Sequence, residues 1–294
     1  MEEIVLNLIN SSKYELLGEG FISKSYKLEI NSEKYILLQG QISDSYDCYL
    51  KSFNNLKFLF NENNPLIKSV QFPSNKISLI KPNQNYPFFK YGGLLYIEIK
   101  GLVFYEKYFD KINIEKISTT ISKFLKELYW IPINKDDIEK VRSKMIKSFN
   151  SDMLIIKKYF GNENIDKINA FENEYLNYIN SFDDFHYTHG DFWQENMIIS
   201  EDYQDIVGVV DFDNFGLGDI AKDYASLLDF GFDFINVLID KTKDIIQDKE
   251  DFIKRIKIYE KFIELEDVAY ILKYENLKGR LNSKLENLKK LNLI

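Results

Sequence analysis

The sequence contains few of the residues that build disulfide frameworks, zinc sites or long linkers. Its 294 residues include one cysteine, Cys48, two histidines, 13 glycines and 5 prolines. A single cysteine excludes a disulfide framework and a cysteine zinc site, and we expect it to serve as a small hydrophobe, with a reactive thiol as the alternative. The scarcity of glycine and proline excludes a collagen-like chain and a long disordered linker.

Long apolar runs and a signal-like start are missing as well. The most apolar stretch, residues 227–239, is interrupted by Asp229 and Asp233, so it falls short of the roughly 20 residues that span a membrane. The chain starts with Glu2 and Glu3, whereas a secretory signal carries positive charge at this place. We therefore expect a cytoplasmic protein without a membrane partner.

Hydrophobic residues and acidic residues are abundant. Hydrophobic residues make up 45% of the chain, which is enough for one large domain or two lobes. The 46 acidic and 38 basic side chains give a net charge of −8. Between Glu201 and Asp240 the only base is Lys222. Such a segment repels nucleic acid and favours metal ions or cationic small molecules as partners.

The residue pattern predicts an α+β architecture. The first part is β-rich, with a hairpin at 24–38 that turns at Asn31 and Ser32, a helix at 44–60, and strands at 76–80 and 94–99. The second part is mainly helical, with helices predicted from residue 114 on, at 136–158, 165–180 and 220–237, and over most of 249–291. We predict a small N-terminal lobe over 1–96, a hinge at 97–101 and a larger helical C-terminal lobe over 102–294.

One segment of the helical half is predicted to be β and to carry the chemistry. Residues 197–200 and 206–210 are short apolar strands separated by a polar turn, so we expect an antiparallel hairpin. Asn196 precedes the first strand and Asp211 follows the second, which places both at the same end of the hairpin. With Asp191 five residues upstream, these hard oxygen donors suit Mg²⁺.

Phosphoryl transfer requires this set of groups, namely a carboxylate beside the acceptor hydroxyl and oxygen ligands for the metal that neutralises the phosphates. Singly, each of these residues is more typical of a turn or a helix cap. The ordered series His189, Gly190, Asp191, Asn196 and Asp211 favours the catalytic interpretation.

The motifs HGDFWQEN (189–196) and VVDFD (209–213) resemble the signature of the aminoglycoside phosphotransferase and choline kinase superfamily, nearest to the bacterial aminoglycoside phosphotransferases. The resemblance implies a protein-kinase-like fold and a cytoplasmic kinase that uses ATP or GTP with Mg²⁺. LGEGFISKSY (17–26) is similar to the nucleotide loop and YIEIKG (96–101) to the hinge. ISKFLKELY (121–129) is similar to the first long helix, with Tyr129 where many members have histidine.

The resemblance implies a role for each matching residue. Asp191 would be catalytic, and Asn196 and Asp211 would hold the metal. The residues implied to contact the nucleotide are Gly18, Gly20, Ser23, Gln39, Ile97 and Ile99.

Other residues are implied to support the site or bind the acceptor. His189 would brace the loop, Trp193 would line the acceptor pocket or pack in the core, and Asp213 would touch the metal or the acceptor. Asp219 and Asp223 would line the next helix, with helix capping as the alternative.

The sequence departs from the superfamily in the N-terminal lobe. Members carry a base on the third strand and a Glu on the next helix, whereas Leu38 or Gln39 and Asn55 stand at these positions here. Three explanations remain open: Gln39 contacts the phosphates as a neutral donor, Lys24 or Lys34 reaches in, or the protein is a degenerate kinase.

The acidic segment favours a cationic acceptor such as an aminoglycoside. Glu264 and Asp267, together with Glu266, would extend the acceptor pocket or would form a solvated helix face. Choline, ethanolamine, amino sugars, macrolides and other small metabolites are the alternatives. A non-catalytic binding protein is the alternative of another class, while a metal hydrolase is disfavoured because the chain has only two histidines. We expect a monomer or a weak dimer.

Overall fold

The computed structural model describes residues 5, 14–60, 66–73 and 76–294, so Glu2 and Glu3 lie outside the described residues. The chain forms two compact units. Unit 1 comprises Met1–Leu128 and His189–Gly216, and unit 2 comprises Tyr129–Thr188 and Leu217–Ile294. The predicted lobes at 1–96 and 102–294 stay a prediction, whereas the predicted α+β class is confirmed by the elements described next.

The main sheet of unit 1 has five antiparallel strands in the order β1-β2-β3-β5-β4. Their bounds are β1 Glu15–Glu19, β2 Ser23–Ile30, β3 Glu33–Gly40, β4 Ser78–Ile80 and β5 Gly93–Ile97. The predicted hairpin is confirmed. Asn31 and Ser32 form its turn with φ of 51° and 65°, the left-handed backbone that a tight two-residue hairpin turn requires.

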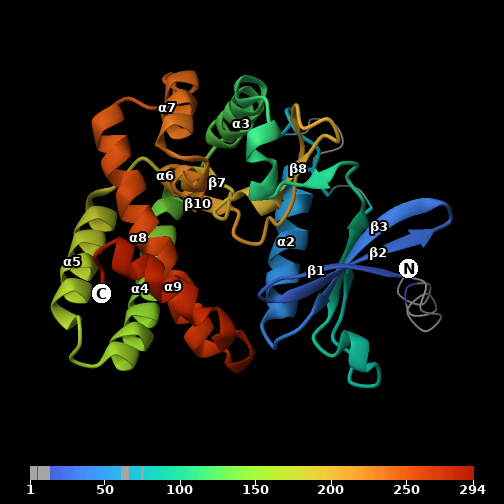
Figure 1. Cartoon of the computed structure of the whole chain (residues 1–294), viewed down its shortest axis with the longest axis horizontal. Coiled ribbons are helices and arrows are strands. Elements are labelled where there is room, and N and C mark those ends of the chain that lie inside the picture. The colour runs from blue at the N-terminus through green and yellow to red at the C-terminus, as the bar shows by residue number, and fades with distance from the viewer. Residues whose placement is uncertain (1–4, 6–13, 61–65, 74–75) are drawn as a thin grey trace. The chain divides into compact units, whose positions relative to one another are not determined.

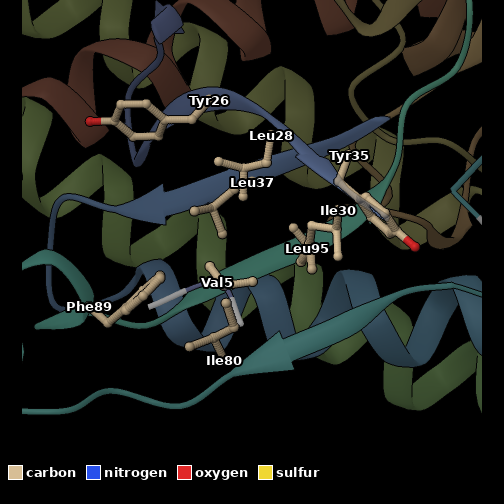
Figure 2. Close-up of a cluster of buried hydrophobic side chains, with 9 residues drawn as sticks. All are labelled: Val5, Tyr26, Leu28, Ile30, Tyr35, Leu37, Ile80, Phe89 and Leu95. Atoms are coloured by element: carbon tan, nitrogen blue, oxygen red, sulfur yellow. The ribbon is translucent and has the colours of Figure 1, made fainter. Parts of the chain in front are cut away.

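The two faces of this sheet bury different apolar clusters, because alternate residues of a strand point to opposite faces. One face carries the cluster of Figure 2, which consists of Val5, Tyr26, Leu28, Ile30, Tyr35, Leu37, Ile80, Phe89 and Leu95. The other face carries Leu94 and Tyr96, with Ile36, Leu38 and the side chains of a helix packed against them.

This helix is α2 (Ser45–Leu59), as predicted from residues 44–60, and it lies alongside the sheet in Figure 1. It buries Tyr49, Leu56 and Leu59 at helical spacing. Tyr49 belongs to the same cluster as Leu94 and Tyr96, so α2 covers the face of the sheet that carries Leu38.

A second sheet of unit 1 has the order β6-β8-β9, with bounds β6 Leu102–Val103, β8 Met197–Ile199 and β9 Ile206–Val209. The predicted β8–β9 hairpin is confirmed, since Met197 pairs with Val209 in an antiparallel register. The helix predicted from residue 114 is α3 (Ile114–Tyr129). Its apolar face is fully buried, as predicted, through Ile117, Ile121, Phe124, Leu125 and Leu128.

Unit 2 is mainly helical, with α4 Ile138–Phe160, α5 Ile165–Ser181, α6 Ala221–Ala225, α7 Phe232–Lys241, α8 Lys249–Lys273 and α9 Leu281–Lys290. Short 3₁₀ turns occur in both units: η1 Pro87–Phe89, η2 Glu106–Lys111, η3 Lys135–Asp137, η4 Gln194–Asn196, η5 Leu228–Phe230 and η6 Glu275–Arg280. No helix among the described residues is long and apolar enough to cross a membrane.

The prediction that most of 249–291 is helical is confirmed, since α8 and α9 occupy most of this range, with η6 between them. Two other predictions about the second half were wrong. The helix predicted at 220–237 is interrupted by η5 and by Gly231, whose φ of 86° does not fit a helix. Strands also occur outside residues 196–211, namely β6 and the pair β7 (His186–Thr188) and β10 (Gly216–Gly218). Strands of two or three residues are too short to show an apolar alternation.

We predict that Leu37→Ala lowers the free energy of unfolding by about 2–5 kcal/mol, because Leu37 is fully buried in the cluster of Figure 2 and its truncation leaves a cavity. Urea denaturation followed by tryptophan fluorescence measures the change. Leu16→Ala is the control, since Leu16 is 55% exposed on β1. Equal losses in the two variants would contradict this assignment of the core.

Candidate active site

The loop between β7 and β8 begins with His189, Gly190 and Asp191. Gly190 has a φ of 82°, and a Cβ atom there would collide with the carbonyl oxygen of Asn214. Only glycine satisfies both conditions. The loop segment before Asp191 is therefore packed directly against the segment that follows β9.

Asn196 connects the two segments. Its Nδ2 donates to the backbone oxygen of Asp191 at 2.8 Å and to Asp191 Oδ2 at 3.1 Å, while its backbone oxygen accepts from Val210 N at 2.9 Å. The next residue after Val210 is Asp211. The structure thus brings Asp191, Asn196 and Asp211 together as the sequence predicted, whereas their roles stay predictions.

Two carboxylates share the segment after β9. Asp211 has a φ of 65°, which is uncommon for a residue other than glycine. Desolvation and then the neighbouring Asp213 carboxylate raise the pKa of Asp211, and desolvation followed by the charge of Asp191 raises the pKa of Asp213. The Asp211 side chain still keeps an accessible surface. A bound cation would therefore reach it and relieve the repulsion between the carboxylates.

These residues fit a magnesium ion that is held partly by phosphates. In the described part of the chain, no three His, Cys, Asp or Glu side chains converge on one metal position. Mg²⁺ does not need three, because it commonly takes one or two protein ligands, substrate phosphates and water. Asn196 donates through Nδ2, so its Oδ1 is the amide atom suited to coordinate a metal beside the Asp211 carboxylate.

Helix α2 contacts the segment after β9 through one stripe of side chains. Asn55 Nδ2 donates to the backbone oxygens of Phe212 and Phe215, at 2.6 and 3.3 Å. Cys48 donates to the Asp213 carboxylate, and burial followed by the Asp213 charge raises the pKa of Cys48 to about 12. Cys48 is thus a protonated thiol, which favours its packing role over a reactive one. The sequence pattern did not predict these contacts, because they join residues more than 150 positions apart.

Gly18 lies in β1, Gly20 lies in the turn that follows, and Ser23 begins β2. Gly20 N donates to Ser23 O at 2.8 Å, and the β1–β2 register shifts between Leu16 and Gly18. Neither glycine has a left-handed backbone, and a Cβ at Gly18 would meet no atom within 4 Å. The fold itself therefore does not require Gly18, which is compatible with a ligand that approaches the backbone.

The predicted hinge residues Ile97 and Ile99 flank Glu98. Glu98 N donates to Lys34 O at 2.9 Å, and its carboxylate pairs with Lys27 Nζ at 2.5 Å. The sequence analysis missed this ion pair. No local pattern points to it, because Lys27 and Glu98 are 71 positions apart.

Gln39 lies on the face of the sheet that is opposite α2. Its Nε2 donates to Phe88 O at 2.6 Å, and its Oε1 accepts from Tyr26 and Gln41. Leu38, on the α2 face, is packed with the Tyr49 cluster. Of the two positions that the sequence left open for the missing strand lysine, Leu38 is therefore the one directed to the side of the sheet that α2 covers.

His189 braces the loop from inside the core. It is fully buried, its Nε2 donates to Val210 O at 3.0 Å, and its ring packs 4.7 Å from that of Phe212. Burial lowers the pKa of His189 to about 4, so the imidazole is neutral at pH 7. Trp193 is half-buried, and its backbone oxygen accepts from Asn196 N at 3.1 Å.

Most of the predicted acceptor residues lie in unit 2, where they have partners. Asp219 is buried and accepts from Tyr178, from Ala221 N at the start of α6 and from Arg255 at 2.5 Å, so it holds the start of that helix and forms a buried ion pair. Lys284 pairs with Glu264 at 3.2 Å and with Asp267 at 2.6 Å. The remaining pair joins Glu266 to Lys222 at 3.2 Å. These contacts favour the structural alternatives for the acidic residues, including capping by Asp219.

We predict that stability falls as the pH is lowered from about 6.5 to about 4, because the unfolded chain binds a proton at His189 in this range and the folded chain does not. Over this pH range, protonation of His189 in the unfolded chain lowers the free energy of unfolding by up to about 3 kcal/mol. Urea denaturation at several pH values measures it. In His189→Gln this part of the slope should disappear, and an unchanged slope would contradict the buried neutral imidazole.

Comparison with known proteins agrees with the geometry. Residues 162–243, which contain Asp191, Asn196 and Asp211, match the model of the phosphotransferase enzyme family, APH. This is the enzyme class predicted from the sequence. A comparison with the curated proteins gives no match.

Solved structures match over nearly the whole chain. The ternary complex of streptomycin, ATP and APH(2″)-IIa is 21% identical over 93% of this chain and 90% of that chain, with a TM-score of 0.64. The macrolide 2′-phosphotransferase MphH from Brachybacterium faecium is 10% identical over 97% of both chains, with a TM-score of 0.61. Ethanolamine kinase from Plasmodium vivax is 14% identical over 95% of this chain and 81% of that chain, with a TM-score of 0.62. The predicted kinase-like fold is thereby confirmed: the chain has the fold of these aminoglycoside, macrolide and ethanolamine kinases, and its residues 162–243 match the phosphotransferase enzyme family.

Proposed function

We propose that this protein is a small-molecule kinase that transfers the terminal phosphoryl group of ATP or GTP to a hydroxyl group. The observation that carries the proposal is the convergence of Asp191, Asn196 and Asp211, in which Asn196 bonds to the Asp191 side chain and its own backbone accepts from the residue before Asp211. The match of residues 162–243 to a phosphotransferase family supports the same reaction class.

The mechanism assigns one task to each of these residues. Asp191, held by Asn196, orients the acceptor hydroxyl and accepts its proton late in the transfer. Asn196 Oδ1 and the Asp211 carboxylate would hold Mg²⁺, and when bound this ion neutralises charge on the phosphate oxygens. His189 holds the loop in place, because its hydrogen bond to Val210 O fixes the backbone next to Asp211.

The nucleotide is proposed to lie against unit 1. The open turn at Gly18, Gly20 and Ser23 would cover the phosphates, and the backbone at Ile97 and Ile99 would bind the base. The presence of ATP in the complex with APH(2″)-IIa supports this co-substrate. In this proposal residues 1–96 form the nucleotide lobe, 97–101 the hinge and 102–294 the lobe that receives the acceptor.

The acceptor is proposed to be a cationic molecule, with an aminoglycoside as the first choice, and the enzyme would then act in the cytoplasm as an antibiotic resistance factor. The excess of acids between Glu201 and Asp240 supports a cation. Several acidic side chains of unit 2 are neutralised by Arg255, Lys222 and Lys284, which weakens the support from those residues. The Plasmodium vivax ethanolamine kinase makes ethanolamine the principal alternative.

We predict that Asp191→Asn lowers the turnover number at least 100-fold and leaves nucleotide affinity nearly unchanged, because the variant keeps the shape of the side chain but cannot accept the proton. A coupled nucleotide-turnover assay with Mg²⁺ tests this across aminoglycosides, macrolides, amino sugars, choline and ethanolamine. Turnover stimulated by one class, and lost in the variant, would identify the acceptor. Near-normal turnover in the variant would contradict the assignment of Asp191.

We predict that Asp211→Asn weakens ATP binding about tenfold or more in the presence of Mg²⁺, which corresponds to about 1.4 kcal/mol, and has little effect without Mg²⁺. Calorimetry with and without the metal measures both affinities. Asp202→Asn is the control, since Asp202 is an exposed acid of the β8–β9 turn. An unchanged magnesium dependence in Asp211→Asn would contradict its role as a metal ligand.

A further inference from the structure

The proposed nucleotide site has an excess of negative charge that the strand residues do not balance. Asp191, Asp211 and Asp213 lie close together. The charge of Asp213 raises the pKa of Asp211, and the charge of Asp191 raises the pKa of Asp213. Transfer from a nucleoside triphosphate adds about four more negative charges, which kinases balance with metal ions and at least one basic side chain. Leu38 cannot supply that base, although β3 directs it to the face that α2 covers.

The lysines of β2 and β3 are not placed to replace it. Lys24 is paired with Glu19 at 3.5 Å and stands opposite Gln39, so it lies on the face remote from α2. Lys27 is paired with Glu98 at 2.5 Å. Lys34 is on the correct face, but it is four residues from Leu38, or about 13 Å along the strand.

Helix α2 offers a different cation. Cys48, Lys51, Asn55 and Phe58 follow one another at intervals of three, four and three residues, so they form one stripe along the helix. Three of them contact the segment after β9: Cys48 bonds to Asp213, Asn55 bonds to Phe212 O, and the ring of Phe58 lies 6.1 Å from that of Phe215. Lys51 lies between Cys48 and Asn55 in this stripe and therefore faces the same segment.

The environment of Lys51 leaves its ammonium group available. The residue is exposed, and it forms no ion pair with any of the described residues. Its charge nevertheless acts on the Asp213 carboxylate. Cys48 and Asn55, on the neighbouring turns of α2, fix the helix to the segment after β9. The long, flexible side chain of Lys51 can therefore turn to a phosphate there without breaking an existing ion pair.

We propose that Lys51 binds the phosphates of the nucleotide and replaces the strand lysine whose position Leu38 occupies. This inference rests on the proposed kinase function and adds a residue to its nucleotide site. It changes the interpretation of the missing lysine, because the basic group is then not lost but moved from β3 to α2. The Lys51 ammonium group would bind the nucleotide phosphates where α2 contacts the segment after β9.

We predict that Lys51→Met weakens the binding of ATP with Mg²⁺ at least tenfold and leaves the binding of adenosine within a factor of two, because adenosine has no phosphates. Calorimetry measures both affinities. Lys57→Met is the matched control, since Lys57 is an exposed lysine of the same helix that lies over the Phe53 ring at 4.2 Å. In that variant both affinities should be retained.

A rescue experiment separates phosphate binding from a structural role. Leu38→Lys in the Lys51→Met background should recover at least part of the ATP affinity, and Lys51→Arg should keep most of it. Equal losses for ATP and adenosine in Lys51→Met, or no loss, would overturn the proposal. A wild-type protein that binds neither ligand would overturn the proposed function together with it, whereas normal turnover with an unaffected Lys51→Met variant would overturn only the role of Lys51.

Discussion

Asn196 is the residue on which the arrangement of the site depends. Its side chain donates to the backbone and to the carboxylate of Asp191, and its backbone oxygen accepts from Val210 N directly beyond the last residue pair of β8 and β9. One residue thereby fixes the distance between the loop that carries Asp191 and the segment that carries Asp211. Around it, the contact of Gly190 with the Asn214 carbonyl and the buried His189 restrict the same two segments. Rigid support of this kind is what holds catalytic groups in a productive geometry.

Charge balance is the second constraint, and it links the sheet, α2 and the segment after β9 that carries Asp211 and Asp213. Desolvation raises the pKa of both Asp211 and Asp213, and a side-chain hydrogen bond joins the two carboxyl groups, so ionising both costs free energy that a bound cation offsets. Asn55 holds the same segment through its backbone carbonyls and adds no charge. The superfamily that the sequence resembles carries a basic residue on the third strand and a Glu on the next helix, whereas Leu38 and Asn55 stand at these positions here. Because both residues are neutral, neither leaves an unpaired charge.

Several acidic residues of unit 2 are balanced by internal partners. Asp219 is satisfied by Arg255, Tyr178 and the start of α6, and Lys284 of α9 neutralises two carboxylates of α8. Acidic residues in a sequence therefore give only an upper limit for the negative charge that a ligand would meet. The discrimination between a highly cationic antibiotic and a small amine depends on the carboxylates that remain without an internal partner.

The sequence alone determined the elements with strong local signals and the order of the site residues. The hairpin at Asn31 and Ser32, α2, the buried face of α3 and the β8–β9 pair follow from periodicity and turn residues, and that pair implied the approach of Asn196 to Asp211. The break at Gly231 and the short strands β6, β7 and β10 were missed, because three residues show no period and one glycine does not by itself end a helix.

Only the tertiary structure decided the partners of side chains. Strand alternation could not tell which face α2 would cover, and so could not separate Leu38 from Gln39. The bonds of Asn55 to Phe212 and of Asp219 to Arg255 join residues far apart in the sequence. Such pairs depend on how the elements pack, and local sequence patterns carry no information about that.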